Sequence, residues 1–120
     1  MGLNKNQLSE FIRNVRIYKD FFTEFYKKQP LVVRKKIYWT ILLIQTIKIV
    51  PEKYLKHLTN SEGLWEIRVS ASNGIFRIFC FFDKGNLIIL LTGFQKKDRK
   101  TPKSEIKRAE KLKKEYYENK

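Results

Sequence analysis

Two arginines, Arg68 and Arg77, are the residues of this sequence best suited to binding an anion, because a guanidinium group contacts two oxygens of one phosphate. Both lie in the stretch 61–94, which is close to neutral and mostly apolar, whereas the stretches on either side are strongly basic. A charge inside an apolar strand is costly unless it reaches solvent or a ligand, so we expect both side chains to face a binding surface. The alternative is that Arg68 pairs with Glu66 and that nothing binds there.

The overall charge supports an anionic partner. The chain has 120 residues with 26 Lys and Arg against 12 Asp and Glu, a formal net charge of +14. An anionic partner relieves the self-repulsion of so basic a protein, and nucleic acid is the commonest such partner. The other interpretation is that solvated lysines only keep the protein in solution.

The sequence also favours a reducing, intracellular setting. Cys80 is the single cysteine and lies in an apolar run, so we expect a buried structural thiol and no disulfide within the chain. The first ten residues lack the apolar core of a signal peptide, and no run of residues is long and apolar enough for a membrane helix. We therefore expect a cytoplasmic protein.

The patterns along the chain predict an α+β protein made of one domain, residues 1–120, in which residues 1–10 form a flexible or short helical extension. Helical spacing of apolar residues indicates three helices, two of them bounded by Asp20, Pro30 and Pro51. The expected order is β-α-α-β-β-β-α, with helices packed on a twisted antiparallel sheet. The expected elements are strand 11–18, helix 21–28, a helix from 30 to before 51, a loop over 54–60, strands 64–70, 75–82 and 87–94, and a helix from 102 to 118.

Strand parity places the two arginines on one face of this sheet. A two-residue turn at Asn73-Gly74 pairs Ser70 with Arg77 and makes Arg68 and Arg77 diagonal neighbours, about 7–8 Å apart. Trp65, Ile67, Val69, Phe76, Ile78, Cys80 and Phe82 then form the core face, and a turn centred on Lys84-Gly85 adds Leu87, Ile89 and Leu91 to it. The opposite face gathers Arg68, Arg77, Thr92, Phe94 and Lys96, with Glu66 beside them. Basic and aromatic groups on one open face suit phosphate contact and base stacking.

Three segments resemble the HigB-like toxins of the RelE/ParE superfamily. Tyr54 to Leu58 followed by Leu64-Trp65-Glu66-Ile67-Arg68 is similar to their K-x-L…LWELR segment, and Ile75 to Phe79 is similar to their Y-R-I-F strand. Residues 90–106 resemble their LLHGFxKKTxKTPxxEI segment. The match covers about residues 50–117, and the N-terminal half agrees only in the order of elements.

The resemblance implies a RelE-like fold and the toxin of a type II toxin–antitoxin system, which cleaves mRNA on the ribosome. The implied chemistry needs no metal or other cofactor: a ribose 2′-OH attacks the adjacent phosphodiester and leaves a cyclic phosphate and a free 5′-OH. The implied partners are the ribosome, mRNA and a cognate antitoxin, usually a helix-turn-helix, HigA-like protein. The implied catalytic residues are Arg68, Arg77, His57 and Lys56, and the implied RNA-binding residues are Lys96, Lys97, Phe94, Thr92, Tyr54 and Lys100.

Some of these roles have alternatives. His57 is the only histidine and suits proton transfer near neutral pH, but a loop histidine often hydrogen-bonds locally instead. Tyr54 either stacks on a base or holds its loop in place, and we favour the second interpretation. Many relatives carry His at the position of Thr92, which cannot act as a general base, so proton transfer would fall to His57 or Lys56.

Two other functions stay open on the sequence. One is a ParE-like inhibitor of gyrase on the same fold without nuclease activity, and the other is a basic nucleic-acid-binding module without catalysis. The arginine pair and the lysine-rich segment 95–100 favour the nuclease. The sequence has no metal-ligand spacing, phosphate-binding glycine loop or nucleophile elbow.

Overall fold

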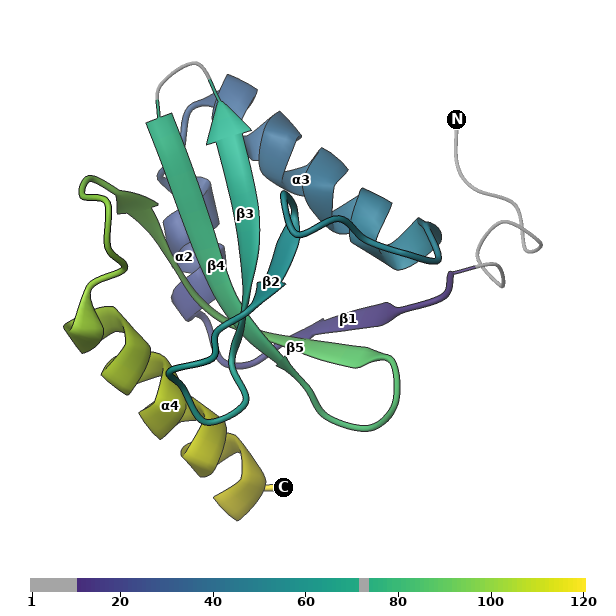
Figure 1. Ribbon diagram of the computed structural model, residues 1–120, viewed down its shortest axis with the longest axis vertical. Coiled ribbons are helices and arrows are strands. Elements are labelled where there is room, and N and C mark those ends of the chain that lie inside the picture. The colour runs from purple at the N-terminus through teal and green to yellow at the C-terminus, as the bar shows by residue number, and fades with distance from the viewer. Residues whose placement is uncertain (1–10, 72–73) are drawn as a thin grey trace.

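The computed structural model describes residues 11–71 and 74–120, and these form a five-stranded sheet with three helices (Figure 1). The expected N-terminal extension, residues 1–10, lies outside the described residues. The α+β class predicted from the sequence is confirmed. The elements are β1 (Asn14–Ile17), α2 (Phe21–Lys27), α3 (Leu31–Thr46), β2 (Leu55–His57), β3 (Trp65–Ala71), β4 (Gly74–Phe82), β5 (Leu87–Lys96) and α4 (Lys103–Glu118).

The sheet differs from the expected one in two ways. Its strand order is β1-β5-β4-β3-β2, and β1 pairs with β5 in parallel, so the sheet is mixed and the prediction of a fully antiparallel sheet was wrong. The segment expected to be a loop also contains β2, which pairs antiparallel with β3 and forms one edge of the sheet. The element order therefore has one more strand than predicted.

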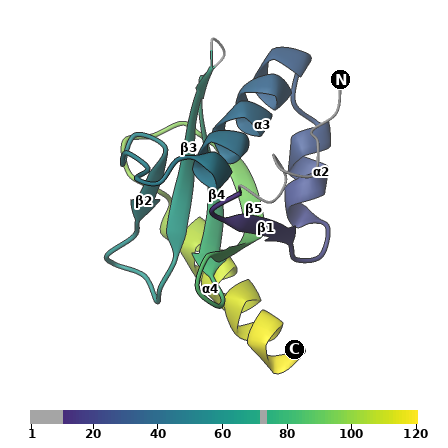
Figure 2. The same ribbon diagram turned by 90° about the vertical axis from the view of Figure 1, so that its right-hand side faces the viewer.

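The two faces of the sheet carry different helices (Figure 2). Helices α2 and α3 cover one face, where Phe22, Val33 and Ile37 pack among the inward side chains of β3 and β4. Helix α4 packs on the other face through Ile106, Ala109, Leu112 and Tyr116. Cys80 is fully buried on the α2–α3 side, as expected, and this burial raises the pKa of its thiol.

The pairing of β4 with β5 contains a bulge between Phe79 and Cys80, and because of it the predicted core face of β5 was wrong. Phe79 pairs with Thr92 but Cys80 pairs with Leu90, so β5 carries one extra residue at this point. Consequently Ile88 and Leu90 pack on the α2–α3 side, whereas Ile89 and Leu91 pack against α4. The prediction had Leu87, Ile89 and Leu91 facing the α2–α3 side. The predicted turn centred on Lys84-Gly85 was also too short, since Phe82 pairs with Ile88 and Asp83 N–H donates to Leu87 O.

Close approach between α2 and β5 requires a glycine at residue 93. A Cβ atom there would overlap the ring of Phe25 from α2. This contact lets α2 lie directly on β5, next to the strand end from which the segment 97–102 leads to α4. None of the described helices is long and apolar enough to span a membrane.

Candidate functional site

A groove of about 890 Å³ lies on the side of the sheet that carries α4. The end of β2 and the loop after it form one part of its wall, and the segment between β5 and α4 forms another. Six Lys or Arg residues and two acidic residues line it, so the groove suits an anionic ligand. The lining residues are Lys56, His57, Leu58, Thr59, Asn60, Glu66, Arg68, Lys96, Asp98, Arg99, Lys100, Thr101, Pro102, Lys103 and Ile106.

Arg68 and Arg77 lie directly opposite each other on β3 and β4. The predicted diagonal arrangement was wrong by two residues of register, because Gly74 is the first residue of β4 and pairs with Ala71. A shift of two residues leaves the facing of every side chain unchanged. The two arginines therefore share the face predicted for them.

Glu66 lies between the two guanidinium groups. Its Oε1 is 3.4 Å from Arg68 Nε and 3.7 Å from Arg77 Nε, and only 4% of the residue is exposed. The pairing of Arg68 with Glu66 that the sequence left open is thus present, and it lies next to a groove. Among the described residues, Glu66 Oε2, Arg68 Nε and Arg77 Nε are buried without a hydrogen-bond partner. Glu66 and Arg68 of this cluster line the groove.

The two arginines differ in exposure. The Arg68 side chain is 30% exposed, lines the groove and donates from Nη1 to Glu52 O at 3.3 Å. Arg77 is only 5% exposed, does not line the groove and donates from Nη1 to Phe76 O at 3.1 Å. Burial lowers the pKa of Arg77, the Glu66 carboxylate opposes that shift, and the nearby Arg68 adds to it. Parity correctly put Arg77 away from the α2–α3 core, but the expectation of an open side chain was wrong, because Phe79, Phe94 and α4 also pack on this face.

Lys56 and His57, adjacent on β2, point to opposite faces of the sheet. Lys56 pairs with Glu66 across β2 and β3, so its side chain is on the arginine face. His57 pairs with Trp65, and the two ring centroids are 5.0 Å apart. Trp65 packs against the α2–α3 core, so the His57 ring lies on that side, at the sheet edge where the residue also lines the groove.

Four other predicted site residues lie outside the groove lining. Thr92 is 1% exposed opposite Phe79, and its Oγ1 is buried without a hydrogen-bond partner among the described residues. Phe94 lies opposite Arg77 and packs on Phe79 with ring centroids 5.3 Å apart. Tyr54 contacts the Trp39 ring of α3, which agrees with the holding role that we favoured, and Lys97 is exposed beside the groove. Lys96 and Lys100, in contrast, line the groove as expected.

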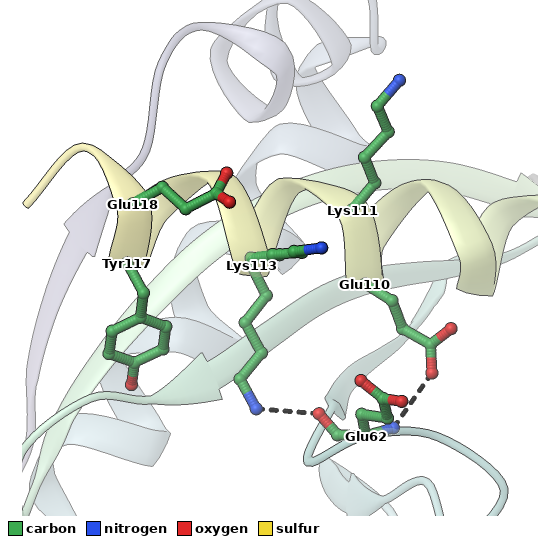
Figure 3. A pocket seen from close by; sticks show the side chains of 7 residues that line it. Glu62, Glu110, Lys111, Lys113, Tyr117 and Glu118 are labelled. Atoms are coloured by element: carbon green, nitrogen blue, oxygen red, sulfur yellow. Dashed lines mark hydrogen bonds between the residues drawn. The ribbon is translucent and has the colours of Figure 1, made fainter.

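The loop after β2 is fixed to α4 at two points (Figure 3). Lys113 Nζ donates to Glu62 O at 2.7 Å, and Glu62 N–H donates to Glu110 Oε2 at 2.9 Å. Within the loop, Ser61 Oγ donates to Leu58 O and accepts from Leu64 N–H. These bonds hold the part of the loop that contributes Thr59 and Asn60 to the groove wall.

The sequence interpretation missed three charged residues of the groove. Asp98, Arg99 and Lys103 line it beside Lys100, because the segment between β5 and α4 turns along the groove. The run of charged residues that follows β5 could have indicated these three residues. The central position of Glu66 was harder to predict from the sequence, since it depends on the register of β3 with both neighbouring strands.

The fold and the groove define an α+β protein with a mixed five-stranded sheet and a basic groove on one of its faces. A solved structure, the crystal structure of the archaeal RelE-RelB complex from Pyrococcus horikoshii OT3, is similar to this chain with a TM-score of 0.52 and 15% identity. The similarity covers 69% of this chain and 93% of the other. Residues 24–114 match the family described as phage derived protein Gp49-like (DUF891). The chain therefore belongs to the Gp49-like family. No match was found among curated proteins.

Proposed function

We propose that this protein is the toxin of a type II toxin–antitoxin system and acts as a ribosome-dependent mRNA endoribonuclease. The observation that carries the proposal is a basic groove with Arg68 in its wall and a buried Glu66 linking Arg68 to Arg77. Membership of the Gp49-like family and the similarity to a RelE structure support it. So does the sequence resemblance to HigB-like toxins.

The proposed reaction is an internal transfer within the RNA. The 2′-oxygen of one nucleotide attacks the adjacent phosphorus, the bond from phosphorus to the 5′-oxygen breaks, and a 2′,3′-cyclic phosphate forms. One proton leaves the 2′-hydroxyl and one is delivered to the departing 5′-oxygen, so the reaction needs no water and no redox partner. Arg68 contacts the phosphate and stabilises the negative charge that grows on it in the transition state.

Arg77 and Glu66 act through Arg68 in this scheme. Arg77 is buried and does not line the groove, so it is a positioning residue. Glu66 contacts the Nε edge of each guanidinium and thereby limits the orientations that Arg68 adopts. Fixed donors stabilise a transition state better than mobile ones because they need little reorganisation.

Proton transfer falls to Lys56 and His57, which both line the groove. Lys56 lies on the face of Glu66 and Arg68, and in this scheme it protonates the departing 5′-oxygen. The His57 ring packs against Trp65 on the α2–α3 side, so in this scheme it turns around the sheet edge toward the groove to accept the proton of the 2′-hydroxyl. Lys96 and Lys100, which also line the groove, hold neighbouring phosphates of the RNA. The proposed protein partner is a cognate helix-turn-helix, HigA-like antitoxin.

Mapping the 5′ ends of cellular mRNA by primer extension after induction tests this function. We expect cuts in phase with codons that vanish in Arg68→Ala, and cleavage by the purified protein only when ribosomes are present. Intact mRNA with DNA damage would instead indicate the gyrase-inhibitor function, and RNA binding without either effect would indicate a binding module. Each of these two outcomes would overturn the nuclease proposal.

A further inference from the structure

An aromatic and basic surface lies on the other side of the β2 edge from the groove. It is formed by Trp39 and Lys36 of α3 and by Lys53 and Tyr54, which precede β2. Trp39 is 44% exposed, and its ring centroid is 5.7 Å from that of Tyr54 in an edge-on contact. Exposed apolar groups that adjoin one another indicate a contact surface more strongly than a single exposed side chain does.

Each of the two rings has an ammonium group close to it. Lys36 Nζ is 4.6 Å from the centroid of Trp39, and Lys53 Nζ is 5.5 Å from the centroid of Tyr54. The Lys36 ammonium lies over the Trp39 ring, so a nucleobase that stacks on this face would displace the ammonium and bring its own phosphate near it. Aromatic rings interleaved with cations are the arrangement by which proteins bind single-stranded nucleic acid without reading its sequence.

The charge of the surrounding surface also fits a nucleic acid. Helix α3 carries Arg34, Lys35 and Lys36 and no acidic residue. A hollow of about 600 Å³ next to Trp39 is lined by Val32, Lys35, Lys36, Trp39, Ser70 and Ala71, with no acidic side chain among them. Glu52 is the acidic residue closest in sequence to Tyr54, and it is exposed.

The aromatic surface and the groove are connected through Arg68. The Arg68 N–H donates to Tyr54 O at 2.8 Å, and Arg68 Nη1 donates to Glu52 O. The segment that carries Tyr54 thus borders Arg68 on one side and Trp39 on the other. Since β2 is an edge strand, no further strand of residues 11–71 and 74–120 lies between the groove and Trp39 at this edge.

We propose that Trp39 and Tyr54, with Lys36 and Lys53, form a base-stacking site that extends the RNA path beyond the groove. The ligand is a single-stranded RNA segment that continues from the groove around the β2 edge. This inference rests on the proposed binding of RNA in the groove. It adds a contact on the opposite side of the sheet, which raises affinity for long RNA and leaves the cleavage chemistry to the groove.

The test measures binding of fluorescein-labelled oligouridine of about 6 and about 15 nucleotides by fluorescence anisotropy. We expect Trp39→Ala to weaken binding of the long RNA about tenfold and of the short RNA less than about twofold. Trp39→Phe keeps a stacking ring and should restore most of the affinity. Arg68→Ala should weaken both RNAs, because both occupy the groove. Far-ultraviolet circular dichroism checks that each variant is folded.

Tyr38→Ala is the matched control. Tyr38 is 66% exposed on the same helix but lines a separate hollow with Phe22 and Tyr26. Equal affinities of Trp39→Ala and Tyr38→Ala for the long RNA would overturn the inference. So would a loss of binding to poly-glutamate in Trp39→Ala with RNA affinity unchanged, because that would assign the surface to an acidic protein partner.

The outcome for this surface is separable from the outcome for the proposed nuclease. RNA binding that depends on Trp39, in a protein that leaves mRNA uncut, would uphold the stacking site and remove the nuclease activity. Codon-phased cleavage together with wild-type affinity of Trp39→Ala for long RNA would keep the nuclease and remove the stacking site.

Discussion

Arg68 and Arg77 face each other across β3 and β4, and both place Nε within 4 Å of the same Glu66 oxygen. Two cations directly opposite on a sheet repel each other unless an anion lies between them. Glu66 supplies one negative charge for two positive ones, so the cluster keeps an excess positive charge. A bound phosphate would supply the missing negative charge.

We expect Arg68→Ala to lower the rate of mRNA cleavage by at least about 100-fold, because the phosphate loses a preorganised donor in the transition state. The variant should remain folded, since the Arg68 side chain is 30% exposed. Cleavage of a defined mRNA on purified ribosomes gives the rate. Lys84→Ala is the control: it removes the same charge from an exposed residue in the turn between β4 and β5, which does not line the groove. Equal losses in the two variants would mean that overall charge, and not Arg68, determines the rate.

We expect Glu66→Gln to lower the free energy of unfolding by about 3 kcal/mol, because the buried Arg77 loses its compensating charge. Cleavage should also fall, since the Arg68 side chain loses the contact that orients it. Urea denaturation and the ribosome assay provide the two readouts. Glu62→Gln makes the same chemical change in an exposed side chain and should stay within about 0.5 kcal/mol of the wild type. An unchanged denaturation midpoint in Glu66→Gln would show that Arg77 does not depend on this carboxylate.

Affinity for RNA should fall steeply as salt concentration rises. Each phosphate contact releases counterions, so the logarithm of the binding constant falls by about 0.7 per contact for each unit of log salt. Removing one groove contact by Lys96→Ala or Lys100→Ala should reduce the slope by about that amount. Titrations of oligouridine at several salt concentrations give the slope. A flat response in the wild type would contradict a phosphate-dominated surface.

The attachment of α4 near its C-terminal end should weaken in acid. Lys120 Nζ and Tyr116 Oη both donate to Asp83 at 2.7 Å, and these bonds lower the pKa of the Asp83 carboxyl below its ordinary value of 3.8. A lowered pKa in the folded protein adds stability that is complete above the unfolded value and is lost as pH falls through the folded value. We therefore expect the difference in melting temperature between the wild type and Asp83→Asn to be constant near neutral pH and to shrink below pH 3.8. A difference that persists at about pH 2 would assign the effect to packing rather than to the charge.

Local patterns predicted the strands and helices well, but not the pairing of distant segments. The alternation in β3 and β4 placed Glu66, Arg68 and Arg77 on one face, because parity survives a two-residue shift of register. The bulge beside Phe79 was not predictable, since residues 78–82 and 87–91 are all apolar and give no local sign of an extra residue. Strand β2 has only three residues, which is too short for a periodic pattern.

The sequence indicated which cations belong to the candidate site, but not which of its side chains are buried. Lys56, Arg68, Lys96 and Lys100, which the sequence proposed as site residues, line one groove. The burial of Arg77 and Thr92 could not be read from parity, because α4 and the ring of Phe94 pack on the same face. That packing depends on long-range contacts that the helix sequence alone does not specify.

The parallel pairing of β1 with β5 has a consequence for biosynthesis. Asn14 pairs with Leu87 and Ile17 with Leu90, so β1 has no strand partner until residues 87–90 have left the ribosomal tunnel. Closing so long a loop late is expected to slow the final step of folding. A nascent chain would therefore carry an unpaired β1 for as long as β5 is still to be made.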